Sequence, residues 1–280
     1  MLGDRVRSLL ARKSAAIMGI LNVTPDSFSD GGRFNSLDSA IKHARVLREQ
    51  GADIIDIGGE STRPGAEQLS EQQELDRVIP VIESLAGEIS QAISIDTYKP
   101  VVMREAVAAG ASMINDVNGL RFEGAIETVA ELKVPVCVMH MLGQPDSMQI
   151  SPHYDDVVAH MFDFFTQRIN ECVSKGIERS DIIIDPGIGF GKTLDHNLQL
   201  LAHLSELHHQ NNCQLLIGVS RKSLIDKLLN RPVNERMSAS IGLAVQAVLN
   251  GAKIVRVHDV RESYDAIRAI EAVLQQRKLK

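Results

Sequence analysis

The chain is poor in aromatic residues and cysteine, and it contains no long apolar run. It has no Trp, 3 Tyr and 7 Phe among its 280 residues. Its three cysteines, Cys137, Cys172 and Cys213, lie far apart without metal-ligand spacing, so we expect reduced structural thiols rather than disulfides or a zinc site. No stretch approaches the roughly 18 consecutive apolar residues of a transmembrane helix, and the charged residues 1–14 do not resemble a signal peptide. These absences predict a cytoplasmic protein that does not bind membranes.

A strongly basic composition is also missing. The chain has 30 Lys and Arg against 36 Asp and Glu, for a formal charge of -6. A protein that binds nucleic acid through its phosphates usually carries a broad basic surface, so we expect no nucleic-acid partner. The hydrophobic share of 44% and the charged share of 24% are ordinary for a folded globular domain, and the length fits one large domain.

Eight short apolar runs recur along the chain, each bounded by turn residues. They are continuous rather than alternating in polarity, which is typical of strands buried on both faces of a parallel sheet. The runs are residues 15–23, 52–58, 92–96, 112–117, 134–141, 181–187, 215–220 and 252–259.

Segments with helical periodicity lie between most of these runs. A possible N-cap at Ser36, a capping-box pattern at Ser70 and Gln73, and Pro100 at a first helical position mark three of the helix starts. Before three of the runs, a Gly-Ala pair closes a helix and opens a strand. The predicted helices are 36–50, 70–85, 100–109, 155–175, 194–208, 236–250 and 260–276.

Eight strand and helix units in this length predict a closed (β/α)8 TIM barrel. An open doubly wound sheet would more often show a GxGxxG turn after its first strand, and the sequence has none there. We therefore expect one α/β domain over residues 15–280, preceded by an N-terminal extension at residues 1–14.

In such a barrel the carboxyl ends of the strands meet at one mouth, where the chemistry takes place. Every predicted strand here ends in a polar or ionisable group. We interpret Asp116 and Asp259 as helix caps or supporting groups, and His140 as a wall residue as much as a functional one. The groups at the strand ends are Asn22, Asp56, Asp96, Asn115, Asp116, His140, Asp185, Ser220, Arg221, Lys222, Arg256, His258 and Asp259.

The residue types predict a site with two parts. Carboxylates and an amide beside Lys222 suit a flat heterocycle with adjacent N–H donors, whereas Arg63, Arg256 and His258 suit a phosphate. The oxygen of Asn22 could join a hydrated Mg²⁺ that is bound mainly through that phosphate. Two polar loops rich in Gly and Pro, 24–35 and 58–67, are candidate lids, and the stretch 185–193 lacks the spacing of a nucleotide phosphate loop.

Eight motifs, in this order, resemble those of the dihydropteroate synthase family. They are MGILNVTPDSFSDGG, IIDIGGESTRPGA, ISIDTYKP, MINDV, CVMHM, DPGIGFGK, GVSRKS and IVRVHDV, and they run from about residue 17 to the last helix. The resemblance implies a (β/α)8 enzyme of folate synthesis, usually a homodimer and belonging to a sulfonamide-target family. Such an enzyme condenses 6-hydroxymethyl-7,8-dihydropterin diphosphate with 4-aminobenzoate and releases diphosphate.

The resemblance also implies roles for individual residues. The implied catalytic residues are Asp96, Lys222, Arg256 and His258. The implied pterin ligands are Asp96, Asn115, Asp185 and Lys222; the diphosphate ligands are Arg63, Arg256 and His258, with Asn22 and Mg²⁺; and the aminobenzoate site is lined by Thr62, Pro64, Phe190 and Ser223.

The implied reaction is a dissociative substitution, in which a carboxylate such as that of Asp96 stabilises a pterin-methyl cation. The sequence departs from the family pattern at Tyr98, where many relatives have a small hydroxyl residue, and at the loop 117–120.

Three other functions fit parts of the pattern. A pterin barrel that transfers a methyl group to a corrinoid would share the carboxylates and amide, but it should not need Arg256 and His258. A Schiff-base aldolase would use Lys222 as its nucleophile, although Arg221 sits beside it without an evident base. A pterin-binding homologue without turnover would be expected to lack a strand-end group or to have a shortened loop, and the sequence shows neither.

Overall fold

The computed structural model describes residues 2–23, 32–61, 68–143, 148 and 150–277, with only the backbone at 32–36 and 277. Its eight strands form a closed barrel in the order β1 to β8, and all neighbouring strands are parallel. This confirms the predicted (β/α)8 architecture. The strands are β1 Ala16–Asn22, β2 Ile54–Gly58, β3 Ala92–Asp96, β4 Met113–Asp116, β5 Val136–Met139, β6 Ile182–Asp185, β7 Gln214–Ile217 and β8 Ala252–Val257.

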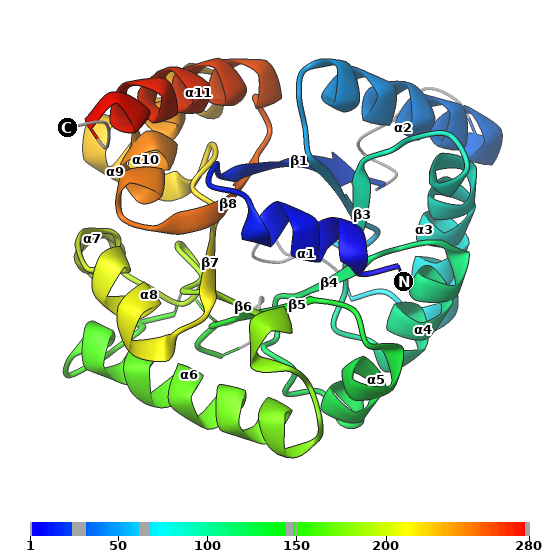
Figure 1. Cartoon of the computed structure of the whole chain (residues 1–280), viewed down its shortest axis with the longest axis horizontal. Helices are drawn as coiled ribbons and strands as arrows, with labels where there is room; N and C mark the ends of the chain where they lie inside the picture. The colour runs from blue at the N-terminus through cyan, green and yellow to red at the C-terminus, as the bar shows by residue number, and fades with distance from the viewer. Residues whose placement is uncertain (1, 24–31, 62–67, 144–147, 149, 278–280) are drawn as a thin grey trace.

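Helices surround the barrel, and their apolar sides pack on the outer faces of the strands (Figure 1). The helices are α1 Asp4–Ala11, α2 Gly32–Glu49, α3 Glu71–Ala86, α4 Pro100–Ala109, α5 Ala125–Leu132, α6 Val157–Ser174, α7 Leu194–Ala202, α8 Leu204–Asn211, α9 Ser223–Leu229, α10 Met237–Leu249 and α11 Val260–Arg277, with 3-10 turns at Arg179–Asp181 and Val233–Glu235. In the part of the chain that the structure covers, no helix combines the length and apolar character needed to span a bilayer.

Local signals explain several helix boundaries. At the start of α3, Gln73 N donates to Ser70 Oγ (3.3 Å) and Ser70 N donates to Gln73 Oε1 (2.9 Å), which is the predicted capping box. The predicted glycine ends are present as well. Gly110 has a φ of +123°, and a Cβ added there would lie 2.5 Å from the Cβ of Ala86, so only glycine fits between α4 and β4.

The structure differs from the predicted helices in five places. α2 begins at Gly32, four residues before the proposed N-cap at Ser36. The single helix predicted over 194–208 is two helices, broken at His203, whose ring Nδ1 lies 2.8 Å from the carbonyl of Gln199 and competes with the helical backbone pattern. The short helices α1, α5 and α9 are not among the predicted helices.

The N-terminal residues close one end of the barrel. Val6, Leu9 and Leu10 of α1 are buried against side chains from the beginnings of the strands, including Met18 and Ile254. Figure 1 shows α1 lying across that end of the barrel. The side chain of Arg7 holds the helix in place by donating to both oxygens of Asp181, at 2.8 Å and 2.7 Å. The opposite end, where the strands finish, is left for the mouth.

Candidate functional site

The strand register places four neighbouring strand ends side by side. Asn22 pairs with Gly58, Gly58 with Asp96, and Asp96 with Asn115. Gly58 keeps this edge open, because a Cβ added there would lie 3.6 Å from the Cβ of Asp96 and 3.8 Å from Asn22 Oδ1. The mouth therefore presents an amide oxygen, a carboxylate and a second amide in one row.

Arg256 of β8 reaches across the barrel to two carboxylates. Its Nε donates to Asp56 Oδ2 at 2.6 Å, and its Nη2 donates to Asp96 Oδ2 at 2.8 Å. Asn115 Nδ2 also donates to Asp56 Oδ2, at 3.1 Å. The arginine that the sequence assigned to the phosphate thus lies in direct contact with the carboxylate assigned to the heterocycle.

Asp56, which the sequence analysis places at a strand end without assigning it a role, is the central residue of this cluster. It is fully buried on β2, and its Oδ1 has no hydrogen-bond partner in the described part of the chain. The sequence did carry a signal, because a carboxylate in the middle of the apolar run IIDIG needs a buried partner. That partner, Arg256, is 200 residues away along the chain.

Burial changes the protonation of this cluster. It raises the pKa of Asp96 to about 7, an effect that the charge of Arg256 partly offsets and that of Asp56 reinforces. Burial alone would lower the pKa of Arg256, but Asp56 and Asp96 together raise it above its ordinary value, so the guanidinium stays charged. Near neutral pH, the cluster thus combines a fixed cation with a carboxylate that can change its charge.

Lys222 and Asp185 occupy the other side of the mouth. Lys222 donates through Nζ to the carbonyl of Ile188, and this Nζ lies 4.6 Å from the centre of the Phe190 ring. Burial lowers the pKa of Lys222 to about 8, although the charge of Asp185 favours the ammonium form. Burial likewise raises the pKa of Asp185, and the charge of Lys222 opposes that shift. The lysine and the carboxylate therefore support each other's charged form in a largely dry site.

The loop between β6 and α7, residues 186–193, is held by Lys192. This side chain is only 1% exposed and donates to the carbonyls of Phe190 (2.9 Å) and Gly187 (3.1 Å), with His140 Nδ1 at 3.0 Å. Gly187 has a φ of +64°, and a Cβ there would lie 1.9 Å from the carbonyl oxygen of His140. The lysine in this glycine-rich motif thus fixes the loop, a role that its sequence did not reveal.

The remaining strand ends supply supporting groups. Ser220 Oγ accepts from His258 N at 3.1 Å and lies 3.0 Å from His258 Nδ1, while Ser223 opens α9. Asp116 accepts from the backbone N–H groups of Asn118 (2.6 Å) and Leu120 (3.0 Å), so it supports the turn at 117–120 and is not a helix cap, since α5 begins only after Gly124.

An apolar wall stands beside the polar groups. Phe190 and Tyr98 pack against a buried cluster that contains three methionines. The wall residues are Val117, Met139, Met141 and Met148, with Tyr98 and Phe190 packed on them. A planar ring held by the carboxylates would find an apolar surface here.

A second ionic cluster, which the sequence did not single out, supports the end of β2. Lys99 is buried, and its Nζ donates to Glu60 Oε2 (2.5 Å) and Glu74 Oε2 (2.6 Å), while Tyr98 donates to Glu60 Oε1 (3.2 Å). Glu60 lies within the loop 58–67 that the sequence marks as a candidate lid. The predicted site residues Thr62, Arg63 and Pro64 lie outside the described residues, as do 24–31 of the first candidate lid.

Comparison with known proteins places this chain beside one group of enzymes. The family described as "pterin binding enzyme" matches residues 18–258. Dihydropteroate synthase of Escherichia coli (strain K12) is 52% identical over 264 residues, covering 94% of this chain and 93% of that protein.

Two solved structures are equally similar. Dihydropteroate synthase of Yersinia pestis, solved with a sulfonamide drug complex, superposes with a TM-score of 0.89 at 52% identity, covering 95% of this chain and 96% of that one. The Xanthomonas albilineans enzyme with 4-aminobenzoic acid gives a TM-score of 0.88 at 48% identity and covers 94% of each chain.

Proposed function

We propose roles for these residues on one premise: this chain belongs to the pterin-binding enzyme family and is a transferase that catalyses the dihydropteroate synthase reaction of folate synthesis. It condenses 6-hydroxymethyl-7,8-dihydropterin diphosphate with 4-aminobenzoate to give 7,8-dihydropteroate and diphosphate. The observation that carries the assignment of roles is the position of Arg256, whose guanidinium joins Asp56 and Asp96 at the centre of the mouth.

The pterin ring is bound, in this proposal, by Asp96, Asn115, Asp185 and Lys222. Carboxylate and amide oxygens accept from the adjacent N–H groups of such a ring, while the Lys222 ammonium donates to its oxygen or nitrogen acceptors. Lys222 Nζ donates to a carbonyl oxygen, that of Ile188, as it would to an oxygen acceptor of the ring. The apolar wall that includes Phe190 and Met139 would cover a face of the ring.

The diphosphate is bound by cationic groups, for which we propose Arg63, Arg256 and His258. Asn22 supplies a single amide oxygen at the exposed end of β1, beside the space that Gly58 leaves open. One protein oxygen fits Mg²⁺ that keeps several waters and takes its other ligands from a phosphate. Elsewhere in the described chain no three His, Cys, Asp or Glu residues are grouped to hold a metal. When bound there, Mg²⁺ would neutralise charge on the leaving group.

The proposed substitution begins when the bond between the pterin methylene carbon and the diphosphate oxygen breaks, and diphosphate leaves with the electron pair. The methylene cation is delocalised into the ring, and the buried ionised carboxylate of Asp96 stabilises it. The nitrogen of 4-aminobenzoate then forms the new bond to carbon and loses a proton.

For 4-aminobenzoate we propose a site formed by Phe190, Ser223, Thr62 and Pro64. Phe190 lies on the loop fixed by Lys192, and Ser223 is the first residue of α9, which follows Lys222 directly. The first two of these residues therefore flank the lysine assigned to the pterin.

We also propose that the protein is a cytoplasmic homodimer. Large apolar side chains are exposed near one another in sequence on α9, the 3-10 turn that follows it and the start of α10. They are Leu228 and Leu229 (48% and 51% exposed), Val233 (56%) and Met237 (41%). Such a surface is commonly buried in an oligomer.

The test of the reaction is to incubate the purified protein with the dihydropterin diphosphate and Mg²⁺, with and without 4-aminobenzoate, and to measure diphosphate and dihydropteroate. We expect both products in equal amounts when both substrates are present. Tight pterin binding without product would instead support the non-catalytic homologue, and the absence of both binding and product would contradict the assignment.

Two variants test whether pterin binding and diphosphate release depend on different residues. Asp185→Ala should weaken binding of a pterin that lacks diphosphate, measured by calorimetry, whereas Arg256→Ala should mainly reduce the rate of diphosphate release. Equal losses of pterin affinity in both variants would contradict this division.

A further inference from the structure

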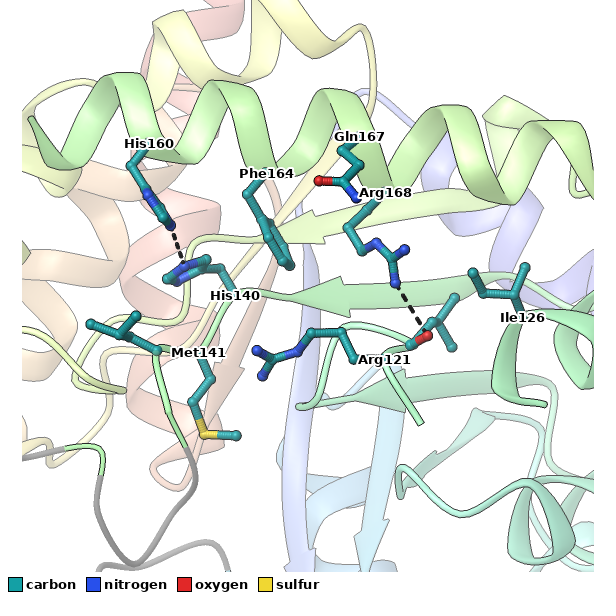
Figure 2. A pocket seen from close by; sticks show the side chains of 10 residues that line it. Arg121, Ile126, His140, Met141, His160, Phe164, Gln167 and Arg168 are labelled. Carbon is teal, nitrogen blue, oxygen red and sulfur yellow. Dashed lines mark hydrogen bonds between the residues drawn. The ribbon is translucent and has the colours of Figure 1, made fainter. Parts of the chain in front are cut away.

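A cavity of about 590 Å³ lies outside the barrel, between α5 and α6, and of the groups given roles above it shares only Met141 of the apolar wall. Its walls are the loop after β4, the residues that follow β5, and one side of α6, as Figure 2 shows. This volume is in the range of sites that hold a small organic molecule, roughly 300 to 1,000 Å³. The cavity is not lined by the residues proposed to hydrogen-bond the pterin or by those assigned to 4-aminobenzoate.

The walls of this cavity combine apolar surface with cations. Phe164 stands edge-on to the ring of His140, with ring centroids 4.8 Å apart, and Leu120, Ile126 and Leu142 add aliphatic surface. Two arginines, Arg121 and Arg168, enter from opposite elements, and Figure 2 shows both guanidinium groups directed into the space below α6.

The two arginines differ in how their charge is balanced. Arg168 forms an ion pair with Glu171 and donates to the carbonyl of Leu120 at 3.3 Å. Among the described residues Arg121 instead hydrogen-bonds to neutral groups, donating to the carbonyl (2.7 Å) and to the side-chain oxygen (3.0 Å) of Asn118. No described carboxylate forms a direct ion pair with Arg121, although the charge of the buried Asp116 favours the charged guanidinium, so this exposed cation faces the cavity without a described carboxylate in contact with it.

The two histidines that line the cavity, His140 and His160, bring no anionic group that could pair with Arg121. Lys192 lies 3.0 Å from His140 Nδ1 and, as an ammonium donor, makes that nitrogen the acceptor. His140 Nε2 then carries the hydrogen and donates to His160 Nε2, 3.2 Å away. These contacts join His140 to Lys192 and to His160, whereas Arg121, which forms no direct ion pair in the described chain, is the group of this cavity that suits an anion.

We propose that this cavity is a second ligand site, which binds a small organic carboxylate with an apolar body. The carboxylate would pair with the Arg121 guanidinium, and the body would lie against Phe164 and the aliphatic walls. A ligand there would also touch His140, which contacts Lys192 of the β6–α7 loop.

The test is calorimetric titration of the full-length protein with 2-naphthoate, in the presence of an excess of a pterin without diphosphate and of the uncharged 4-aminobenzamide, so that the mouth is filled by molecules that carry no carboxylate. We expect binding of one molecule per chain. Arg121→Gln should weaken it by about tenfold or more, because a hydrogen-bonded charge pair is lost. The neutral analogue 2-naphthylmethanol should bind more weakly and should not respond to this substitution.

Two further variants make the result specific. Gln167→Trp places a large ring at the exposed rim of the cavity on α6 and should also block binding. Arg45→Gln removes an arginine that pairs with Glu88 on the outer helices, and it should leave the affinity unchanged. Absence of binding to the wild type, or binding that survives both Arg121→Gln and Gln167→Trp, would overturn the proposal.

Discussion

At the scale of single residues, the centre of the mouth is an ionic cluster in which Arg256 pairs with both Asp56 and Asp96. Asp56 is fully buried, and its second oxygen has no protein partner in the described part of the chain. A buried pair of this kind is weak evidence for stability, because desolvation offsets much of the attraction between the charges. The contribution of the Arg256 ion pairs is to position Asp96, which lies beside Asn115 of β4 and Gly58 of β2.

The raised pKa of Asp96 predicts a pH dependence of the reaction. Burial brings this pKa to about 7, so the side chain is protonated, and unable to stabilise a cation, at lower pH. We expect kcat/KM to rise with pH through about 7, and this limb of the profile to be absent in Asp96→Asn, whose side chain does not titrate. A limb that persists in the variant would assign the titration to another group, such as Asp185.

The same shift has a defined sign for stability. Because the pKa of Asp96 is higher in the folded protein than its ordinary value of 3.8, its contribution to stability is complete below about pH 3.8 and is lost as the pH rises through about 7. Urea unfolding at several pH values should therefore show the wild type losing stability relative to Asp96→Asn over this interval, by at most about 1.4 kcal/mol per pH unit.

At the scale of elements, the loop between β6 and α7 shows how a buried lysine can organise a binding surface. Lys192 holds the carbonyls of Gly187 and Phe190, and this loop also supplies the Ile188 carbonyl that accepts from Lys222. The loop thus connects the groups assigned to both substrates through backbone positions that one side chain fixes.

Lys192→Met should loosen this loop while keeping a side chain of similar length. We expect KM for both substrates to rise, with kcat/KM lowered by about tenfold, because positioning of the reacting groups is lost. The effect on kcat should be smaller than that on KM, a split that general destabilisation of the fold would not produce. The matched control is Lys227→Met on the exposed side of α9, which should behave like the wild type; unchanged KM values in Lys192→Met would contradict the role.

At the scale of the whole molecule, one end of the barrel is closed by α1 and the other carries the mouth. The buried residues Val6, Leu9 and Leu10 fill the end where the strands begin. A binding site needs a rigid frame, and the plug leaves the opposite end free for loops and ligands. The exposed apolar residues on α9 and α10 lie on the outside of this frame, where a partner chain could cover them.

The proposed dimer predicts that a charge in this apolar surface separates the subunits. Val233→Glu should convert the protein to monomers in sedimentation velocity, because a carboxylate would be desolvated in the interface. Val173→Glu is the matched control: Val173 is also exposed, at 42%, but it lies on α6. A monomeric wild type, or a dimer that Val173→Glu disrupts and Val233→Glu leaves intact, would place the interface elsewhere or exclude it.

The sequence by itself determined the barrel and the order of its strands. Continuous apolar runs such as IIDIG and AISID are what doubly buried parallel strands require, and eight of them in this length leave few other architectures. The polar residues at the strand ends, including Asp96, Asn115 and Asp185, could be located for the same reason, since each directly follows or ends an apolar run. The strands and the residues at their ends depend on neighbouring positions in the chain, so the local sequence pattern is enough to predict them.

Only the tertiary structure decided which of these groups meet and how their charges are balanced. The contacts of Arg256 with Asp56 and Asp96 join residues 200 and 160 positions apart, and periodicity carries no information about such distances. The burial of Lys192 and the packing of α1 into the barrel likewise depend on surfaces formed by many strands at once. Local sequence sets the elements, whereas burial and pairing of charges arise only when the barrel closes.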